Sequence, residues 1–257
     1  MMNSSKHLRV VISCVAFETV KIVDPIVFYK ADKVYLLHMG TKQPYIGFLK
    51  EVVTQLKKKM KIEPICMDIN ILDFRDILRT IIGIIKKEGS EENHIYVNVG
   101  AGPQIFCAGA LIACMMKGAI AFNVHTEKFT IEDYTQYNIH GKPVGLAKKV
   151  HDPVEIPEFE IRPPKDDLIL GLKILNGIIE KQGLTTSTNI INKLAEKHLM
   201  IKEMEDTGKI NQNSVMRYRR NFLDQWKRNN WVVFKQGRKL EITNQGKIMI
   251  EIFGEET

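Results

Sequence analysis

A short glycine-rich segment in the first half of the chain has the composition of an anion-binding turn. It runs Asn98-Val99-Gly100-Ala101-Gly102-Pro103-Gln104 and leads into an apolar helical pattern that begins near Ile105. The backbone N–H groups and the positive dipole end at a helix N-terminus bind phosphate and carboxylate groups. The segment therefore predicts a site for an anionic ligand, and tight packing of a strand on a helix is its alternative role.

This segment matches none of the standard cofactor fingerprints. A dinucleotide fingerprint has its glycines after the first strand, whereas here they follow the fourth apolar run and Ile105 occupies the place of the third glycine. A Walker loop is excluded because no Gly-Lys-Ser/Thr sequence follows. The seven histidines and four cysteines show no metal-ligand spacing. We therefore expect no cofactor and no metal.

Basic side chains gather on a helix predicted to have Asn213 or Ser214 as its N-cap and to end near Asn230. At 100° per residue its buried face consists of Val215, Phe222, Leu223 and Trp226, with Tyr218 at the edge. The residues expected to contact DNA are Ser214, Arg217, Arg220, Asn221, Lys227 and Arg228. The N-terminal half of such a helix enters the major groove, so Arg217 and Arg220 are expected nearest to bases. Arg219 falls near the apolar side, where its stem is expected to pack.

A tight hairpin is predicted after this helix, from Trp231–Phe234 and Lys239–Ile242. Lys235, Arg238 and Lys239 at its tip give a second basic point that could contact the DNA backbone. Three helices followed by a basic hairpin predict a winged helix-turn-helix that binds double-stranded DNA. A merely solvated charged face, or a winged helix that binds another protein, are the alternatives.

The elements that must position the glycine-rich segment alternate in type. Apolar runs predict strands at Leu8–Ser13, Val34–His38, Ile62–Met67, Ile95–Val99 and Ala119–Val124. Helical spacing of apolar residues predicts helices over Tyr45–Met60 and Asp73–Glu88, the second with Asp73 as N-cap. The fold class is therefore α/β, a Rossmann-like parallel sheet with right-handed crossovers, followed by a mostly α winged helix-turn-helix domain. If the strand order is 3-2-1-4-5, the ligand-binding edge lies between the first and fourth strands.

The chain is expected to divide in two. Residues 1–150 form the Rossmann-like domain, residues 151–165 a proline-rich linker or edge strand, and residues 166–257 the DNA-binding domain. In the last part, helices are predicted from Asp166 to Gly183 and over Thr188–His198, and a final helix begins near Asn244.

The strand, turn and helix over Asn98–Ala113 resemble the signature of the CRISPR-associated Rossmann fold, or CARF, domain. The layout of such a domain with a linker and a winged helix is similar to the archaeal CRISPR-linked transcription regulators and their relatives. The resemblance implies a homodimer and a nucleotide ligand such as a cyclic oligoadenylate. Carried over by position, it implies a ligand site of Ser13, Cys14, Phe17, Gly100, Ala101, Gly102, Pro103 and Gln104.

This sequence departs from the CARF pattern where the family binds phosphate. Gly100 and Ala101 stand where Ser or Thr hydroxyls are common, Pro103 lacks an N–H, and Gln104 replaces a basic residue. Three alternatives stay open: the ligand differs, the backbone amides suffice to bind it, or the pocket is vestigial. Some CARF domains cleave their ligand, but the segment offers no Lys, Arg or Ser to stabilise developing charge. We therefore expect no enzyme, with a ring nuclease as the alternative.

Composition agrees with a nucleic-acid-binding globular protein. The 257 residues are 44% hydrophobic and carry a formal net charge of +7. The four cysteines form no CxxC pair and are expected to be buried and reduced, in a cytoplasmic protein without a signal peptide or a membrane span. The sequence therefore predicts a homodimeric, ligand-responsive transcription regulator. An architectural DNA-binding protein whose Rossmann half only dimerises is a further alternative.

Overall fold

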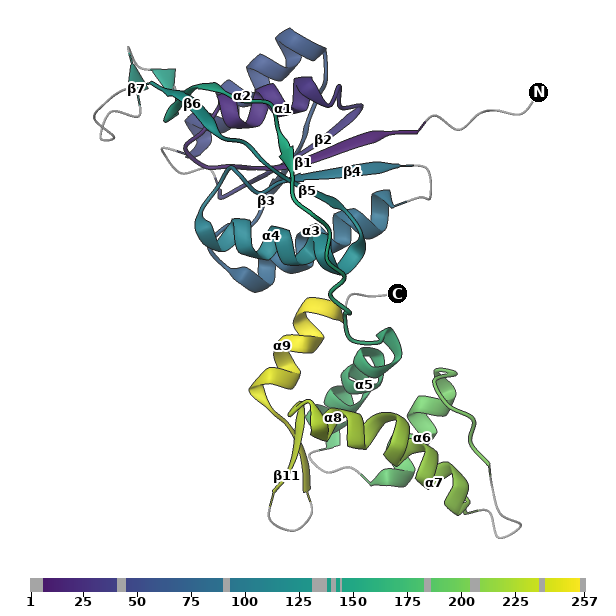
Figure 1. The fold of residues 1–257 in the computed structure, drawn as a ribbon. Coiled ribbons are helices and arrows are strands. Elements are labelled where there is room, and N and C mark those ends of the chain that lie inside the picture. The colour runs from purple at the N-terminus through teal and green to yellow at the C-terminus, as the bar shows by residue number, and fades with distance from the viewer. Residues whose placement is uncertain are drawn as a thin grey trace, which may run out of the picture. The chain divides into compact units, whose positions relative to one another are not determined.

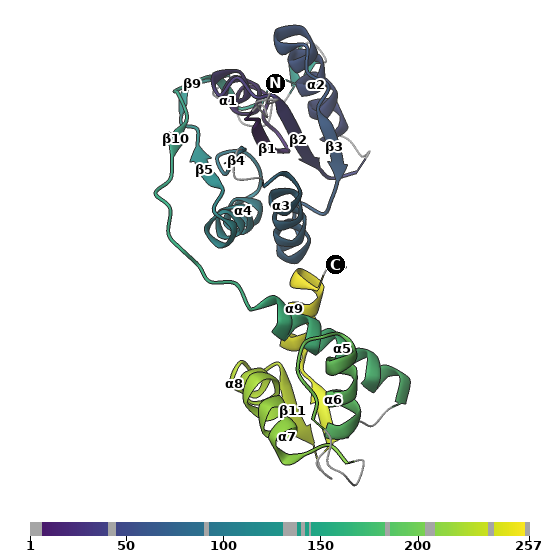
Figure 2. The same cartoon turned by 90° about the vertical axis from the view of Figure 1, so that its right-hand side faces the viewer.

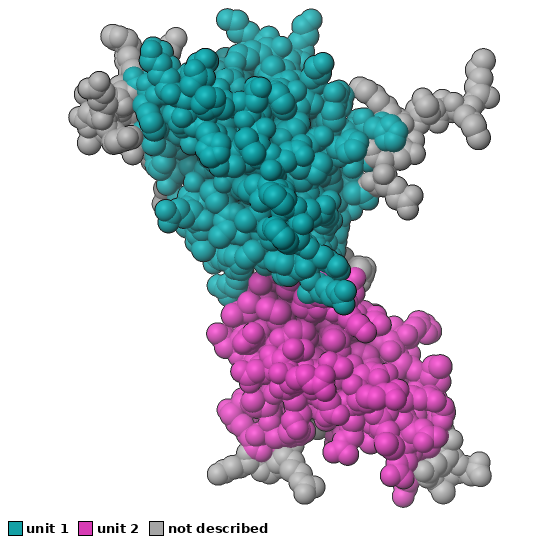
Figure 3. Space-filling view, viewed as in Figure 1, with its two compact units in different colours: residues 1–162 teal, residues 163–257 magenta. Residues whose placement is uncertain are grey.

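The computed structural model describes residues 7–40, 45–89, 93–130, 138–139, 142–143, 145–182, 186–203, 209–235 and 239–254. The chain divides into two compact units, Met1–Arg162 and Pro163–Thr257 (Figure 3). The division falls inside the segment predicted as a linker or edge strand. Within the described ranges, no helix is both long enough and apolar enough to cross a membrane.

Unit 1 is built on a six-stranded sheet with the order β10-β5-β4-β1-β2-β3. Its strands are β1 (Arg9–Val15), β2 (Lys33–His38), β3 (Ile65–Asp68), β4 (His94–Asn98), β5 (Ile120–Asn123) and β10 (Val154–Glu155). The first five are parallel, and β10 pairs antiparallel with β5 as a short edge strand. The predicted order 3-2-1-4-5 is the observed one. Because β1 and β4 are neighbours, the loops that leave them lie side by side.

Helices cover both faces of this sheet. Helices α1 (Val20–Phe28) and α2 (Tyr45–Met60) lie on one face, and α3 (Phe74–Glu88) and α4 (Gln104–Lys117) lie on the other (Figures 1 and 2). The Asp73 carboxylate caps α3 by accepting from the N–H groups of Arg75 and Asp76, as predicted. Gly118 ends α4 in the left-handed conformation at φ 69°.

Two features of unit 1 differ from the sequence-based expectation. Helix α1 was not predicted, because Pro25 lies in its interior and its apolar residues are not confined to one stripe. Cys66 was expected to be buried and is exposed, because β3 is an edge strand. All four cysteines are free, and Cys14 and Cys114 are buried.

Short strand pairs follow β5. Strand β6 (Thr126–Phe129) pairs antiparallel with β9 (Ala147–Val150), and β7 (Asn138–Ile139) pairs with β8 (Lys142–Pro143). The β9 strand is held against the start of α1, because Glu18 accepts a hydrogen bond from the N–H of Ala147 at 3.2 Å. This contact ties the end of the domain to the loop that leaves β1.

Unit 2 contains helices and one hairpin. Its elements are α5 (Asp166–Gln182), α6 (Ser187–Glu196), α7 (Gln212–Tyr218), the π-helical turn η1 (Arg219–Leu223), α8 (Asp224–Arg228), β11 (Val232–Lys235), β12 (Lys239–Ile242) and α9 (Asn244–Phe253). Segments α7, η1 and α8 are continuous, and we call residues 212–228 the third helix. The element order agrees with the prediction. Thr186, Asn211 and Thr243 cap α6, α7 and α9 with side-chain oxygens.

The core of unit 2 lies between the third helix and α5. Trp226 is fully buried, and its indole N–H donates to the C=O of Leu168 at 3.0 Å. Gly171 on α5 lies beneath this ring, and a Cβ there would come within 3.0 Å of both Phe222 and Trp226. The third helix is therefore fixed by its aromatic face, which leaves its polar face to solvent.

Candidate functional site

The residues predicted to bind a ligand meet at the carboxyl edge of the sheet in unit 1. Ser13 and Cys14 lie just before Val15, the last residue of β1. Residues 98–104, which we call the carboxyl-edge loop, connect β4 to α4. Strands β1 and β4 pair in parallel, with Val11 opposite Tyr96. Parallel neighbouring strands end at the same edge, so the two groups of residues are brought together as expected.

Asn98 is the residue that shapes this loop. Its side chain is fully buried and makes three hydrogen bonds. Its amide donates to Ser13 Oγ at 3.2 Å and to the C=O of Lys21 at 2.8 Å, and its oxygen accepts from the N–H of Gly100 at 2.9 Å. Lys21 is four residues before Pro25, which has no N–H to donate to that carbonyl. Asn98 therefore satisfies the carbonyl that Pro25 leaves unpaired, and links β4, β1 and α1.

Three of the eight predicted ligand residues are buried in the structure, which corrects the prediction that their side chains line a site. Ser13 and Cys14 are fully buried and Ala101 is 1% exposed. Ser13 accepts the bond from Asn98, and burial raises the pKa of the Cys14 thiol well above its ordinary value. These side chains support the loop from inside the domain.

The glycines of the loop have packing roles. A side chain at Gly100 would collide with the Asn123 side chain and the backbone of Val124. Gly102 has a φ of +117°, and a Cβ there would lie 2.9 Å from both Cβ and Sγ of Cys14. This geometry agrees with the alternative in which the turn serves close packing. It leaves only backbone groups and Gln104 to face a ligand.

The remaining predicted residues lie nearer the surface. Gln104 is exposed, Pro103 is half-buried as the N-cap of α4, and Phe17 packs edge-on against Phe48 at 5.8 Å between ring centroids. His38 is 9% exposed at the end of β2, and its Nδ1 has no hydrogen-bond partner among the described residues. His125 follows β5, two strands further along the sheet than β1.

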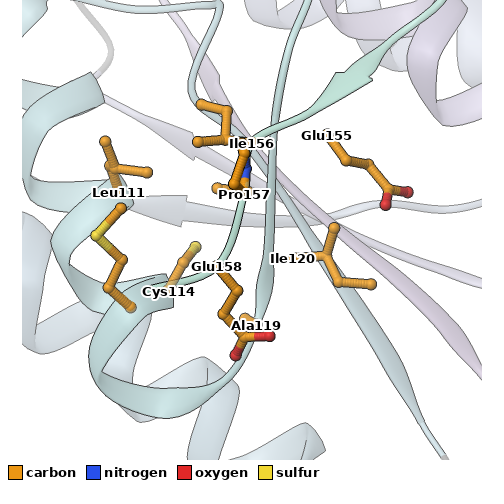
Figure 4. Close-up of a pocket in the computed structure, with 10 residues that line it drawn as sticks. Leu111, Cys114, Ala119, Ile120, Glu155, Ile156, Pro157 and Glu158 are labelled. Atoms are coloured by element: carbon orange, nitrogen blue, oxygen red, sulfur yellow. The ribbon is translucent and has the colours of Figure 1, made fainter. Parts of the chain in front are cut away.

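A cavity of about 290 Å³ in unit 1 lies away from the carboxyl-edge loop (Figure 4). It is lined by Leu111, Cys114 and Met115 of α4, by residues 119–121 at the start of β5, and by residues 155–158. None of the predicted ligand residues lines it. Burial raises the pKa of Cys114 to about 12, so its thiol is a neutral apolar wall. The described residues also contain no group of three or more His, Cys, Asp or Glu side chains that could hold a metal ion.

The third helix of unit 2 carries the second candidate site. Helix α7 begins at Gln212 with Asn211 as its N-cap, so the predicted caps Asn213 and Ser214 were wrong. Ser214 is fully buried, and its hydroxyl accepts a hydrogen bond from the N–H of Glu203 at 2.8 Å. Ser214 therefore does not present its side chain to DNA, which corrects that prediction.

The π-helical turn changes which side chains are exposed. The N–H of Asp224 donates to the C=O of Arg219, five residues earlier, so the turn holds one residue more than an α-helical turn. The stem of Arg219 was expected to pack with its head in solvent, and the residue is exposed. Tyr218 was expected at an edge and is buried. A wheel that assumes 100° for every residue does not represent the extra residue of the π-helical turn. The exposed polar residues of η1 and α8 are Arg219, Arg220, Asn221, Asp224, Lys227 and Arg228.

Arg217 differs from the other cations because it is paired. Its guanidinium lies 2.8 Å from Glu203 Oε1, and Asn211 Nδ2 donates to Glu203 Oε2 at 2.8 Å. The hydrogen bond from Asn211 and the charge of Arg217 hold the pKa of Glu203 below its ordinary value. Sequence reasoning could not detect this pair, because its members lie 14 positions apart in the chain. Glu203 is thus a candidate site residue that sequence reasoning missed.

The hairpin supplies the predicted second basic point in part. Lys239 is exposed, whereas Lys235 forms an ion pair with Glu241 at 2.6 Å. Lys227 of the third helix lies over the Phe234 ring at 5.4 Å, which joins the helix to the hairpin. Arg238 lies outside the described residues.

Comparisons with known proteins were made for the whole chain. The family model described as "HFX_2341_N:-like, N-terminal" matches residues 9–129. Comparison with curated protein sequences gives no match. Among solved structures, Can2 from Sulfobacillus thermosulfidooxidans, in complex with cyclic tetra-adenylate, is 13% identical at a TM-score of 0.40 and covers 96% of this chain. Csm6 from Enterococcus italicus, bound to cyclic hexa-2'-fluoro-hexa-dAMP, is 12% identical at a TM-score of 0.41 and covers 74% of this chain.

A type III CRISPR defence DNA nuclease activated by cyclic oligoadenylate is also similar, at 11% identity and a TM-score of 0.42, over 75% of this chain. The matches extend over 64% of the Can2 chain, 49% of the Csm6 chain and 32% of the nuclease chain. This chain therefore spans less than two-thirds of the length of the similar solved chains. The family model covers the carboxyl-edge loop and stops before unit 2.

Proposed function

We propose that this chain is a cytoplasmic, homodimeric transcription regulator that binds double-stranded DNA through unit 2 as a winged helix-turn-helix. The observation that carries the proposal is the polar face of the third helix, where five arginines and lysines and one aspartate lie between residues 212 and 228. Its aromatic face is packed in the core, and Arg219, Arg220, Lys227 and Arg228 are exposed to a polyanion, while Arg217 is paired with Glu203. Lys239 of the hairpin that follows is exposed and would contact an adjacent phosphate in this proposal.

The test of DNA binding is a titration of the full chain against duplexes at several salt concentrations. Binding to phosphates releases counterions, so the logarithm of the affinity is expected to fall linearly with the logarithm of the salt concentration. Selection from a random duplex library then yields the preferred operator. A chain that binds no duplex at low salt would overturn the proposal.

We further propose that the carboxyl-edge loop of unit 1 binds an anionic nucleotide, with cyclic oligoadenylate as the first candidate. Support comes from the loop's position at the carboxyl edge between β1 and β4, and from its resemblance to the CARF signature. Because Ser13, Cys14 and Ala101 are buried, we expect the backbone N–H groups and Gln104 to make the contacts to phosphate. A ligand bound this way would shift the dimer between two states that differ in affinity for the operator.

The ligand is tested by thermal unfolding of the full chain with cyclic tri-, tetra- and hexa-adenylate. Selective binding to the folded state is expected to raise the midpoint with ligand concentration. Absence of any shift would favour the alternative of an architectural protein whose unit 1 only dimerises. Because we propose binding without catalysis, labelled ligand incubated with the protein should stay cyclic, and linear products would establish a ring nuclease instead.

A further inference from the structure

A hollow lies on the exposed face of the third helix, over α7 and the start of η1. Its volume is about 310 Å³, and it is lined by Asn213, Met216, Arg217 and Arg220. The spacing of these residues is i, i+3, i+4 and i+7, which places them on one stripe of a helix. The stripe is opposite the buried Tyr218 and Phe222. This surface is therefore the part of the third helix that a DNA groove would meet.

Met216 is the unexpected member of this stripe. Its side chain is 62% exposed, although it lies beside two arginines and the core of the unit is on the other face. A large apolar side chain on a basic surface has no packing role in the described part of unit 2. In the DNA major groove the apolar feature is the thymine methyl group, which only one base carries. An unbranched thioether adapts readily to such a group.

Arg217, next to Met216, has its guanidinium paired before any ligand arrives. The ion pair with Glu203 holds it, and Glu203 is itself held by Asn211 and by its own N–H bond to Ser214. A carboxylate at this position would repel phosphate oxygens, whereas it tolerates the neutral edge of a base. A pre-ordered guanidinium loses less conformational freedom when it donates to O6 and N7 of guanine.

We propose, on the basis of the DNA-binding function above, that Met216 and Arg217 are specificity-determining residues that select a thymine next to a guanine, and that Glu203 is the positioning residue of Arg217. Met216 contacts the thymine methyl group, and Arg217 donates to the guanine. Arg220 lies one helical turn further along the same stripe and contributes charge and contacts to the flanking position.

The methyl contact is tested by replacing each thymine of the selected operator, one at a time, with deoxyuridine. The full-length wild type is expected to lose about fourfold in affinity at one position, which corresponds to one buried methyl group. Met216→Ala should weaken binding to the thymine operator, and the affinity of this variant should not fall further when that thymine is replaced with deoxyuridine. Ile201→Ala is the matched control, because Ile201 is 72% exposed in the same unit but lies off the stripe. If the Met216→Ala variant still loses as much affinity as the wild type at each thymine replaced with deoxyuridine, the methyl contact is wrong.

The positioning role is tested by the preference for guanine over 7-deazaguanine, which lacks the N7 acceptor. Glu203→Gln should lower this preference severalfold while raising affinity for unrelated duplexes, because a negative charge leaves the surface. If Glu203 had a purely structural role, Glu203→Gln would lower the affinity for the guanine and the 7-deazaguanine duplexes equally. That result would overturn the assignment. Circular dichroism and the unfolding midpoint verify that the variant is folded.

The outcomes separate this inference from the proposed function. If the wild type binds no duplex, the DNA-binding function fails and the inference fails with it. If it binds duplexes with the expected salt dependence but no thymine depends on Met216, only the inference is wrong. Tighter binding to the single strands of the operator than to the duplex would also overturn it, because the groove is absent there.

Discussion

One buried amide determines the local structure of the carboxyl-edge loop. Asn98 is completely buried, and its side-chain amide makes hydrogen bonds to three different segments of the chain. A buried polar group stabilises a fold only while its partners are present, and a partner left alone costs about 1–3 kcal/mol. The pairing of Asn98 with the carbonyl that Pro25 leaves free makes these two residues dependent on each other.

This dependence gives a double-mutant prediction. Asn98→Leu should lower the free energy of unfolding by about 3 kcal/mol, because Lys21 C=O and Gly100 N–H lose their partner. Pro25→Ala provides an N–H that can donate to Lys21 C=O within α1. Combined with Asn98→Leu, it should restore about 1 kcal/mol. Denaturant unfolding of the four proteins measures the coupling, and strict additivity would contradict the account.

Glu18 gives a prediction about pH. Burial raises the pKa of Glu18 above its ordinary value of 4.5, although the hydrogen bond from Ala147 opposes the shift. The folded protein therefore binds this proton more tightly than the unfolded chain does. The stabilisation due to Glu18 is largest below pH 4.5, declines as the pH rises from 4.5 to the raised pKa, and stays low above it.

Unfolding free energies measured at a series of pH values test this assignment. Glu18→Gln should remove the decline between pH 4.5 and the raised pKa. Glu127→Gln is the matched control, because the hydrogen bond from Lys149 lowers the pKa of Glu127. Its removal should have a small effect of the opposite sign, since the group is exposed. An unchanged pH profile for Glu18→Gln would be evidence against the assignment.

At the scale of elements, the spacing of apolar residues was sufficient to locate the helices and strands in which that spacing is regular. The sequence located α2 without error, found the five parallel strands to within a few residues, and identified Asp73 as a cap. It missed α1, because a proline in a helix interior is unfavourable unless another group pairs the freed carbonyl. That group is Asn98, about 75 residues later in the chain. Local patterns do not contain such a distant contact.

The candidate sites show the same limit. The sequence placed the glycine-rich segment beside the end of β1, yet it could not show that Ser13, Cys14 and Ala101 face inward. The wheel of the third helix was correct at Phe222 and Trp226, and it placed Tyr218 at an edge although that residue is buried. A wheel at 100° per residue cannot represent the π-helical turn over Arg219–Leu223. Glu203 was missed because its pairing with Arg217 depends on the loop that leads into α7.

The hairpin and the third helix should make separable contributions to DNA binding. Lys239→Ala removes an exposed charge that we propose contacts phosphate, so it should weaken binding to all duplexes and reduce the salt slope by about one. Lys235→Ala is the matched control on the facing strand. Its charge is paired with Glu241 at 2.6 Å, so the salt slope should change by less. Equal changes in the two variants would contradict this division.

At the scale of the whole molecule, the positive charge has one location. Thirteen of the 37 lysines and arginines, and six of the 30 aspartates and glutamates, lie between Lys193 and Lys247. The rest of the chain has 24 of each sign, so the net charge of +7 belongs entirely to this segment. Unit 1 has 21 basic and 18 acidic side chains and unit 2 has 16 and 12, so a polyanion would be attracted most strongly to the segment from Lys193 to Lys247.

The proposed homodimer makes a geometric prediction about the operator. A two-fold axis that relates two third helices requires two half-sites in inverted orientation, with centres about one helical turn, or a multiple of it, apart. Inserting about five base pairs between the half-sites turns one of them to the opposite side of the duplex. The second unit 2 then loses its contacts, and the affinity should fall to that of a single half-site. Inserting about ten base pairs restores the facing and should recover part of the loss. Titration of the full chain against the three duplexes measures this, with a duplex carrying one half-site as the reference. Equal affinity for all of them would mean that each chain binds DNA independently, and that dimerisation does not join the two DNA-binding surfaces.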